Sequence, residues 1–99
     1  MTYHCFISEH ASQDIVSAQA WYDEKEEGRG AKYWEAISKK IELLKHTPLM
    51  HAIWKKQYRR GKVIDYPYSI FYTVGVNSIE IIAVLHDHQD VDSMLTNRT

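Results

Sequence analysis

The feature that most constrains the fold is an apolar run, Ile79–Leu85, in which only Glu80 is charged. A run of this length between turn residues is typical of a central strand that is buried on both faces. An aromatic block, Tyr66–Val74, precedes it, and Gly75–Ser78 separates the two segments. This spacing predicts a β-hairpin whose turn has about four residues.

Three further strands are expected to accompany that run. A short aromatic and β-branched segment at the N-terminus has strand character, and so does the basic segment before the aromatic block. Proline cannot donate a hydrogen bond to a strand ladder, so Pro67 marks the approach to its strand. The expected strands are Tyr3–Ile7, Gln57–Ile64, Ser69–Val74 and Ile79–His86.

Two helices are predicted between the first strand and the other three. Ser8 is a suitable N-cap for the first, and Gly28-Arg29-Gly30 separates it from the second, which we expect at about Ala31–His46. Thr47-Pro48 ends the second helix because the residue before a proline avoids the helical region. The apolar stripes contain Ala11, Ile15, Ala18 and Tyr22 in the first helix, and Trp34, Ile37, Ile41 and Leu44 in the second.

These segments predict an α+β fold in the order β-α-α-β-β-β. The short link between the helices favours an antiparallel hairpin, and its apolar stripes need a sheet to pack on. We therefore expect a two-helix hairpin on a mainly antiparallel four-stranded sheet, within one domain that spans residues 1–99. Leu49–Trp54 is expected to be a connection, and Val91–Thr99 to form one helical turn or to fray.

Composition excludes several classes of protein. The net charge of −1 gives no long-range attraction for nucleic acid. The single cysteine, Cys5, excludes an internal disulfide and a cysteine-rich zinc site. No apolar run approaches the roughly 20 residues that span a bilayer, and no signal sequence follows Met1, so we expect a cytoplasmic protein.

Positive charge is concentrated in one segment. Five of the twelve Lys and Arg residues lie in Lys55–Lys62. Such a segment is suited to binding an anion or an acidic target locally, although charges on an edge strand also protect it from aggregation. The predicted target- or anion-binding residues are Lys55, Lys56, Arg59, Arg60, Lys62 and Tyr68.

The same region contains the residue types of a metal-independent ribonuclease. Such an enzyme needs proton-transfer groups and cations that stabilise the charge on phosphorus. His86 and His88 are candidates for proton transfer, and Arg60 and Lys62 for the charge, because alternate residues of a strand share a face. The opposing interpretation is that His86 is a strand-end histidine bonded to the backbone, so both remain open.

Two further patterns are weaker. His86, His88 and Asp90 are spaced too widely along one strand to converge on a single ion without a bend, so we predict no metal and no cofactor. The tyrosines of the aromatic block, Tyr66, Tyr68 and Tyr72, are expected to pack in the core rather than to stack on bases.

The chain resembles the RelE/ParE toxin superfamily of type II toxin–antitoxin systems, and it is closer to the ParE-like branch. The resemblance covers about Ile7 to Asp90 and depends on several short pieces taken together. These are Ala11, Asp14-Ile15, Trp21-Tyr22, Gly28 and Gly30, Thr47-Pro48, Tyr58-Arg59-Arg60, the Tyr66–Tyr72 block, and Ala83-Val84-Leu85-His86.

The resemblance implies a toxin that a co-expressed antitoxin neutralises in a hetero-oligomer. RelE-like members cut mRNA on the ribosome, whereas several ParE-like members inhibit DNA gyrase, and a shared fold does not choose between them. We expect a ParE-like toxin that binds a protein target such as DNA gyrase. The alternatives are a RelE-like mRNA endonuclease and a degenerate toxin that keeps only antitoxin binding.

One departure from the family pattern bears on this choice. The family often has an arginine three residues after the terminal-strand histidine, and this chain has Gln89 there. An mRNA phosphate would need a fixed cation at that place. The neutral Gln89, with Asp87 and Asp90 beside it, favours the protein-binding activity over the nuclease activity.

Overall fold

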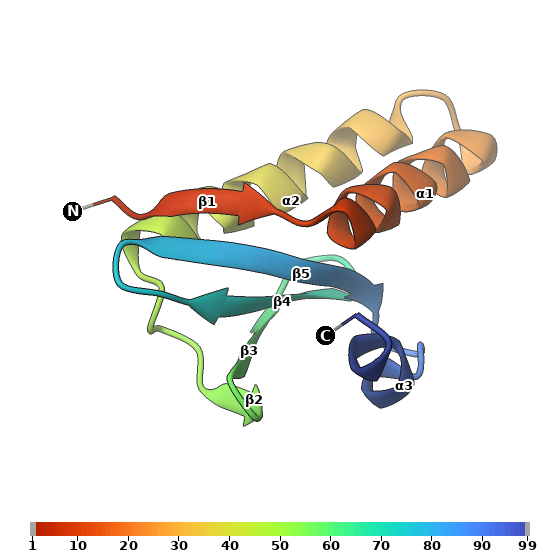
Figure 1. Cartoon of the computed structure of the whole chain (residues 1–99). Helices are drawn as coiled ribbons and strands as arrows, with labels where there is room; N and C mark the ends of the chain where they lie inside the picture. The colour runs from red at the N-terminus through yellow and green to blue at the C-terminus, as the bar shows by residue number, and fades with distance from the viewer. Residues whose placement is uncertain (1, 99) are drawn as a thin grey trace.

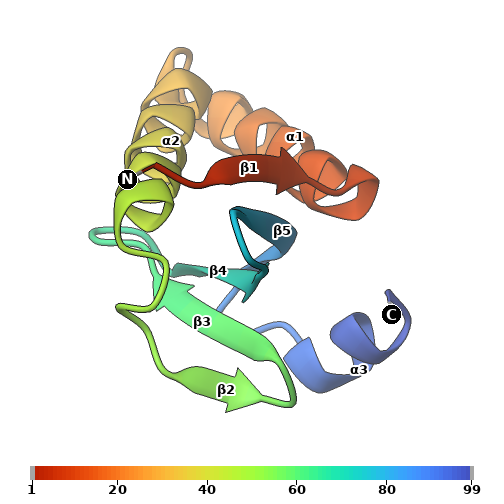
Figure 2. The ribbon, with the colours of Figure 1, turned by 60° about the vertical axis from the view of Figure 1, so that its left-hand side comes forward.

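A computed structural model describes residues 2–98 and shows a helical hairpin packed on one face of a twisted sheet (Figure 1). A third, shorter helix covers part of the opposite face (Figure 2). The elements in chain order are β1 (His4–Ile7), α1 (Glu9–Lys25), α2 (Arg29–His46), β2 (Ile53–Lys55), β3 (Tyr58–Lys62), β4 (Tyr68–Val74), β5 (Ser78–His86) and α3 (Val91–Thr96).

The sheet has five strands in the order β1-β5-β4-β3-β2. β1 runs parallel to β5, with His4 opposite Ser78, and the other neighbours are antiparallel. The expected α+β class and mainly antiparallel sheet are confirmed, but the expected count of four strands is wrong. The additional strand, β2, has only three residues, Ile53–Lys55, which is too short to show a period of two in the sequence.

A bulge in β5 changes which of its side chains point to each face of the sheet. Phe71 of β4 lies opposite Ala83 of β5, and the next residue of β4, Tyr72, lies opposite Ile81. Ile82 is therefore the extra residue of the bulge. Ile81 and Val84 consequently both face the helical hairpin although they are three positions apart. The expectation of a central strand buried on both faces is confirmed.

The first helix forms as predicted, whereas the second differs at its start. Ser8 Oγ accepts a hydrogen bond from the backbone N–H of Ala11 at 3.1 Å, which is the expected N-cap. α2 begins at Arg29 rather than Ala31, and it buries Tyr33 completely while Trp34 is 40% exposed. Tyr33 continues the stripe of Ile37, Ile41 and Leu44 against Tyr22 of α1. The assignment of Trp34 to this apolar stripe is therefore wrong.

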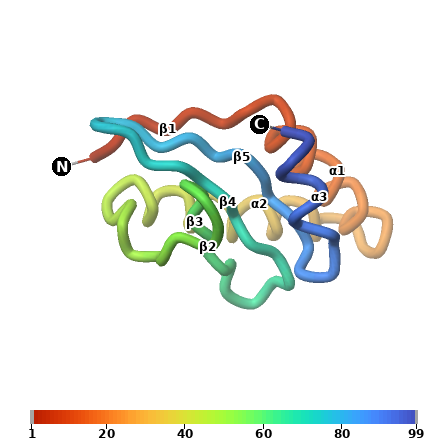
Figure 3. The backbone as a smooth tube through the Cα atoms, turned by 60° about the horizontal axis from the view of Figure 1, so that its bottom comes forward, coloured from red at the N-terminus to blue at the C-terminus, as the bar shows by residue number. Residues whose placement is uncertain are grey.

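The chain after the hairpin is fixed to the core. The buried hydroxyl of Tyr72 donates to the carbonyl oxygen of Pro48 at 2.8 Å, which holds the connection between α2 and β2. The expected helical turn in the C-terminal tail is α3, whose Leu95 is only 3% exposed against the far face of the sheet. The C-terminal end then returns beside the start of α1 (Figure 3). Within residues 2–98, no helix is both long enough and apolar enough to cross a membrane.

Candidate functional site

The sheet separates the predicted catalytic residues into two groups. Arg60 and Lys62 project together from β3 on the face away from the hairpin, as the alternation of a strand requires. Arg59 projects to the other side, where its Nη1 donates to the carbonyl oxygen of His51 at 2.6 Å. His86 ends β5 on the hairpin side, where its ring contacts Tyr68. The predicted cations and the predicted proton-transfer group therefore lie on opposite faces.

Asp87 binds both cations of the first group. Its Oδ2 lies 2.9 Å from Lys62 Nζ, and its Oδ1 lies 3.5 Å from Arg60 Nη2. The buried Ser69 hydroxyl joins this network, because it donates to Asp87 Oδ1 at 3.1 Å and accepts from Arg60 Nε at 3.2 Å. Partial burial by itself would raise the pKa of Asp87, but Lys62, Ser69 and Arg60 together lower that pKa below its ordinary value. The ionised carboxylate holds both cationic side chains and offsets one of their two positive charges.

His86 is held by several neighbours. Its ring packs edge-on against Tyr68 with 5.2 Å between centroids, and its Nδ1 accepts from the backbone N–H of His88 at 3.1 Å. Its own backbone N–H donates to Gln89 Oε1 at 2.7 Å. The strand ends at His86, but the ring of His88 still lies beside that of His86, with centroids 5.1 Å apart. With Nδ1 used in this way, only Nε2 of His86 is left to carry or exchange a proton.

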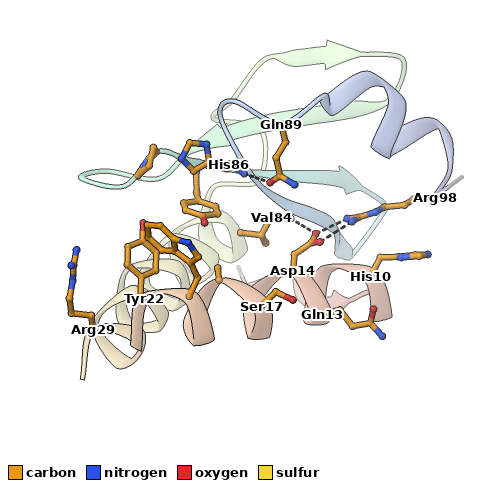
Figure 4. Close-up of a pocket in the computed structure, with 14 residues that line it drawn as sticks. His10, Gln13, Asp14, Ser17, Tyr22, Arg29, Val84, His86, Gln89 and Arg98 are labelled. Atoms are coloured by element: carbon orange, nitrogen blue, oxygen red, sulfur yellow. Dashed lines mark hydrogen bonds and ion pairs between the residues drawn. The ribbon is translucent and has the colours of Figure 1, made fainter. Parts of the chain in front are cut away.

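His86 borders an open cleft of about 700 Å³ between α1 and the end of β5 (Figure 4). At one end of the cleft, the rings of Trp21, Tyr22, Tyr68 and His86 gather near Arg29. The other end is formed by Asp14 and Arg98 together with polar side chains of α1. Only two of these residues, Tyr68 and His86, were predicted from the sequence as functional candidates. The lining residues that were not predicted include Asp14, Trp21, Tyr22, Arg29 and Arg98.

A largely buried ion pair closes the Asp14 end of the cleft. Arg98 Nη1 lies 2.6 Å from Asp14 Oδ2 and Nη2 lies 2.8 Å from Oδ1, and the two side chains are 8% and 12% exposed. Asp14 Oδ2 also accepts from the backbone N–H of Val84 at 3.0 Å, and Arg98 donates to the carbonyl oxygen of Ile82 at 3.3 Å. This ion pair, here called the clasp, therefore joins α1, β5 and the residues after α3.

The clasp had one weak signal in the sequence. Asp14 is the only Asp, Glu, Lys or Arg residue between Glu9 and Asp23. A lone charge in an uncharged helical segment indicates a specific partner, but nothing in the sequence identifies Arg98, which lies 84 positions away.

Tyrosine rings form a continuous cluster behind the ring end of the cleft. Tyr22 and Tyr33 stack with centroids 5.2 Å apart, and Tyr33 contacts Tyr68 at 5.1 Å. Burial raises the pKa of Tyr33, Tyr22 and Tyr68, so their phenols remain protonated near neutral pH. Tyr68 and Tyr72 are buried and Tyr66 packs partly buried beside them, which confirms that these three tyrosines serve packing.

The predicted basic surface is divided by the fold. Lys55 Nζ pairs with Asp92 of α3 at 2.7 Å, and Lys56 lies in the exposed turn after β2 with a φ of 53°. Arg59 is directed to the hairpin side, whereas Arg60 and Lys62 are bound to Asp87. Asp90 caps α3 through the backbone N–H of Ser93 at 3.2 Å, and residues 2–98 contain no group of acidic, His or Cys side chains arranged to hold a metal ion.

Comparison with known proteins identifies the family. Residues 6–91 match the model of a family described as the ParE toxin of type II toxin–antitoxin system, parDE. The chain belongs to this ParE toxin family. A search of curated proteins gives no match.

The fold of this ParE-family protein is also found in a solved structure. That structure is described as the chromosomal ParDE TA system from P. aeruginosa, and it superposes with a TM-score of 0.77 and 15% identity over 86% of this chain and 96% of that chain. The region matched by the ParE family model contains Asp14, His86 and Asp87 but ends before Arg98. The clasp therefore joins the matched region to the C-terminal residues beyond it.

Proposed function

We propose that this ParE-family protein is a toxin that acts by binding a protein target, such as DNA gyrase, and that a cognate antitoxin neutralises it in a hetero-oligomer. The family match supports the toxin assignment. The observation that favours a protein target over mRNA is the separation of His86 from the two cations that Asp87 binds.

A nuclease centred on His86 would need positive charge beside the scissile phosphate. Arg60 and Lys62 are instead bound to the carboxylate of Asp87 on the other face of the sheet, away from His86. Gln89 occupies the position where the family often has arginine, and its neutral amide oxygen accepts a hydrogen bond from the backbone N–H of His86. The cleft beside His86 is instead lined by the rings of Tyr22 and Tyr68 together with Arg29. Aromatic and arginine side chains are enriched at protein interfaces, and this favours contact with a protein surface.

Inducible expression with two parallel measurements tests the proposed target. We expect growth to stop and plasmid supercoiling to fall, while the rate of protein synthesis declines only later. With purified components, the protein should inhibit supercoiling of relaxed plasmid by gyrase and should leave ribosome-bound mRNA intact.

The double variant Arg60→Ala, His86→Ala separates this proposal from the endonuclease. Cleavage of ribosome-bound mRNA by the unmodified protein and not by the double variant would establish the endonuclease instead. Lys39→Ala is the matched control, because Lys39 is exposed on α2 and pairs with the exposed Glu35 of the same helix at 3.7 Å. Normal growth during strong expression without antitoxin would show a degenerate toxin.

The antitoxin is tested separately. A small reading frame beside the gene, encoding a DNA-binding segment and an amphipathic tail, is the candidate. Its co-expression should restore growth, and the two proteins should elute together in size-exclusion chromatography.

A further inference from the structure

Lys40 and His51 form a polar contact that the proposed toxin activity does not use. Lys40 Nζ of α2 lies 2.7 Å from His51 Nε2, in the connection before β2. Arg59 holds the backbone of His51 through its carbonyl oxygen at 2.6 Å. A Cβ added at Gly61 of β3 would lie 3.1 Å from His51 Cδ2 and 3.3 Å from Lys40 Cε, so the missing side chain at Gly61 leaves space for this pair.

The surroundings favour the uncharged forms of both groups. Burial lowers the pKa of Lys40. Burial lowers the pKa of His51 as well, and the charge of Lys40 lowers it further. An uncharged imidazole can accept a hydrogen bond, and eventually a proton, from the amine. Lys39, the next residue, instead pairs with the carboxylate of Glu35 and is largely exposed.

Lys40 is half-buried and open to solvent on one side. It lines an open pocket of about 400 Å³ between α2 and the loop before β4. Leu43, Ile64 and Tyr66 supply apolar surface to this pocket. The charged groups that line it beside Lys40 are Lys32, Glu35, Lys39 and Asp65.

We propose that Lys40 is a site of covalent acylation by activated acyl donors, namely acyl phosphates or acyl thioesters, and that His51 serves as the base. The lysine nitrogen attacks the carbonyl carbon of the donor and forms a C–N bond. The C–O or C–S bond to the leaving group breaks, and phosphate or thiolate departs with the electron pair. His51 Nε2 takes the proton that the nitrogen loses and releases it to solvent, so no oxidant or further reactant is needed.

Acylation with acetyl phosphate, followed by site-resolved mass spectrometry, tests the proposal on the full chain. We expect Lys40 to react faster than Lys39 by on the order of tenfold. This ratio is smaller than the rate enhancement that a positioned general base usually gives, because the pocket is open to water. This advantage should be larger at mildly acidic pH than at high pH, where all lysines become uncharged. A parallel reaction with acetyl-CoA shows whether phosphate and thioester donors are both accepted.

A conservative variant separates a chemical role of His51 from a structural one. His51→Gln keeps a hydrogen-bond acceptor for the amine but removes the proton-accepting group. We expect the rate at Lys40 to fall to that at Lys39, while the rate at Lys39 itself does not change. His46→Gln, at the exposed end of α2, is the matched control. Equal rates at Lys39 and Lys40 in the unmodified protein, or an unchanged Lys40 rate in His51→Gln, would overturn the proposal.

Discussion

The two faces of the sheet are stabilised in different ways. The hairpin face is filled by aliphatic and tyrosine side chains from both helices and from β4 and β5. The opposite face has a smaller apolar cluster, which includes Phe71 of β4 and Leu95 of α3. Beside this cluster lies the polar network around Asp87. One face therefore depends on apolar burial under long helices, and the other combines a short helix with ion pairs.

This difference explains why the candidate site is divided. His86 and Asp87 are adjacent in sequence, but they contribute to opposite faces of the sheet. His86 belongs with the tyrosines under the hairpin, and Asp87 with Arg60 and Lys62. The clasp between Asp14 and Arg98 crosses the edge of β5 and connects the two faces.

The largest expected effect comes from breaking the clasp. Asp14→Ala leaves the guanidinium of Arg98, which is 8% exposed, without its carboxylate, and it removes the acceptor of the Val84 N–H. We expect a loss of about 3–5 kcal/mol in the free energy of unfolding, measured by urea denaturation. Arg98→Met should cost less because Asp14 keeps its bond to Val84. Equal stability of Asp14→Ala and the unmodified protein would show that the faces are held independently.

The second largest effect is expected from shortening a buried apolar side chain, and one variant on each face of the sheet allows the two losses of stability to be compared. Ile37→Ala removes a fully buried side chain beneath the hairpin and should cost about 2–5 kcal/mol. Leu95→Ala should cost less, because α3 has six residues and can settle into the space that is left. Urea denaturation of both variants checks the order, and a greater loss for Leu95→Ala would reverse this view of the two faces.

The close approach of the two helices gives a smaller effect. A Cβ at Gly30 would lie 2.6 Å from the carbonyl oxygen of Gln19, a backbone atom that has little freedom to move. We expect Gly30→Ala to cost about 1–3 kcal/mol in thermal or urea unfolding. Gly75→Ala is the control, because its nearest neighbour is the Ser78 side-chain oxygen at 3.1 Å. Similar losses in the two variants would argue against tight packing at the hairpin.

The smallest effect is expected on the polar face. Asp87→Asn should cost no more than about 1 kcal/mol near neutral pH, since its partners are partly exposed. The pKa of Asp87 in the folded state lies below the ordinary value of an aspartate, so its pairing stabilises the protein at pH values above that ordinary pKa. This stabilisation is lost as pH falls through the lower folded-state pKa. Unfolding measurements should therefore show the difference between Asp87→Asn and the unmodified protein shrinking at acidic pH, and a constant difference would contradict this.

Predictions from the sequence succeeded where the evidence was local. The N-cap at Ser8, the end of α2 before Pro48 and the hairpin of β4 and β5 each follow from residues close together in the chain. The position of Tyr33 was missed because Tyr33 and Trp34 are adjacent aromatic residues, and only contact with Tyr22 and Tyr68 selects one of them. β2 was missed because its three residues become a strand only through pairing with β3.

The sequence by itself determined the helical hairpin, the antiparallel β3–β4–β5 strands and the resemblance to ParE toxins. Periodicity, proline and capping residues act within a few positions of the chain, so they can be interpreted without knowledge of distant contacts. Only the tertiary structure decided that Asp87 binds Arg60 and Lys62, that His86 faces the tyrosines and that Asp14 meets Arg98. These contacts join separate elements, and they depend on strand register and on a bulge that sequence periodicity does not encode.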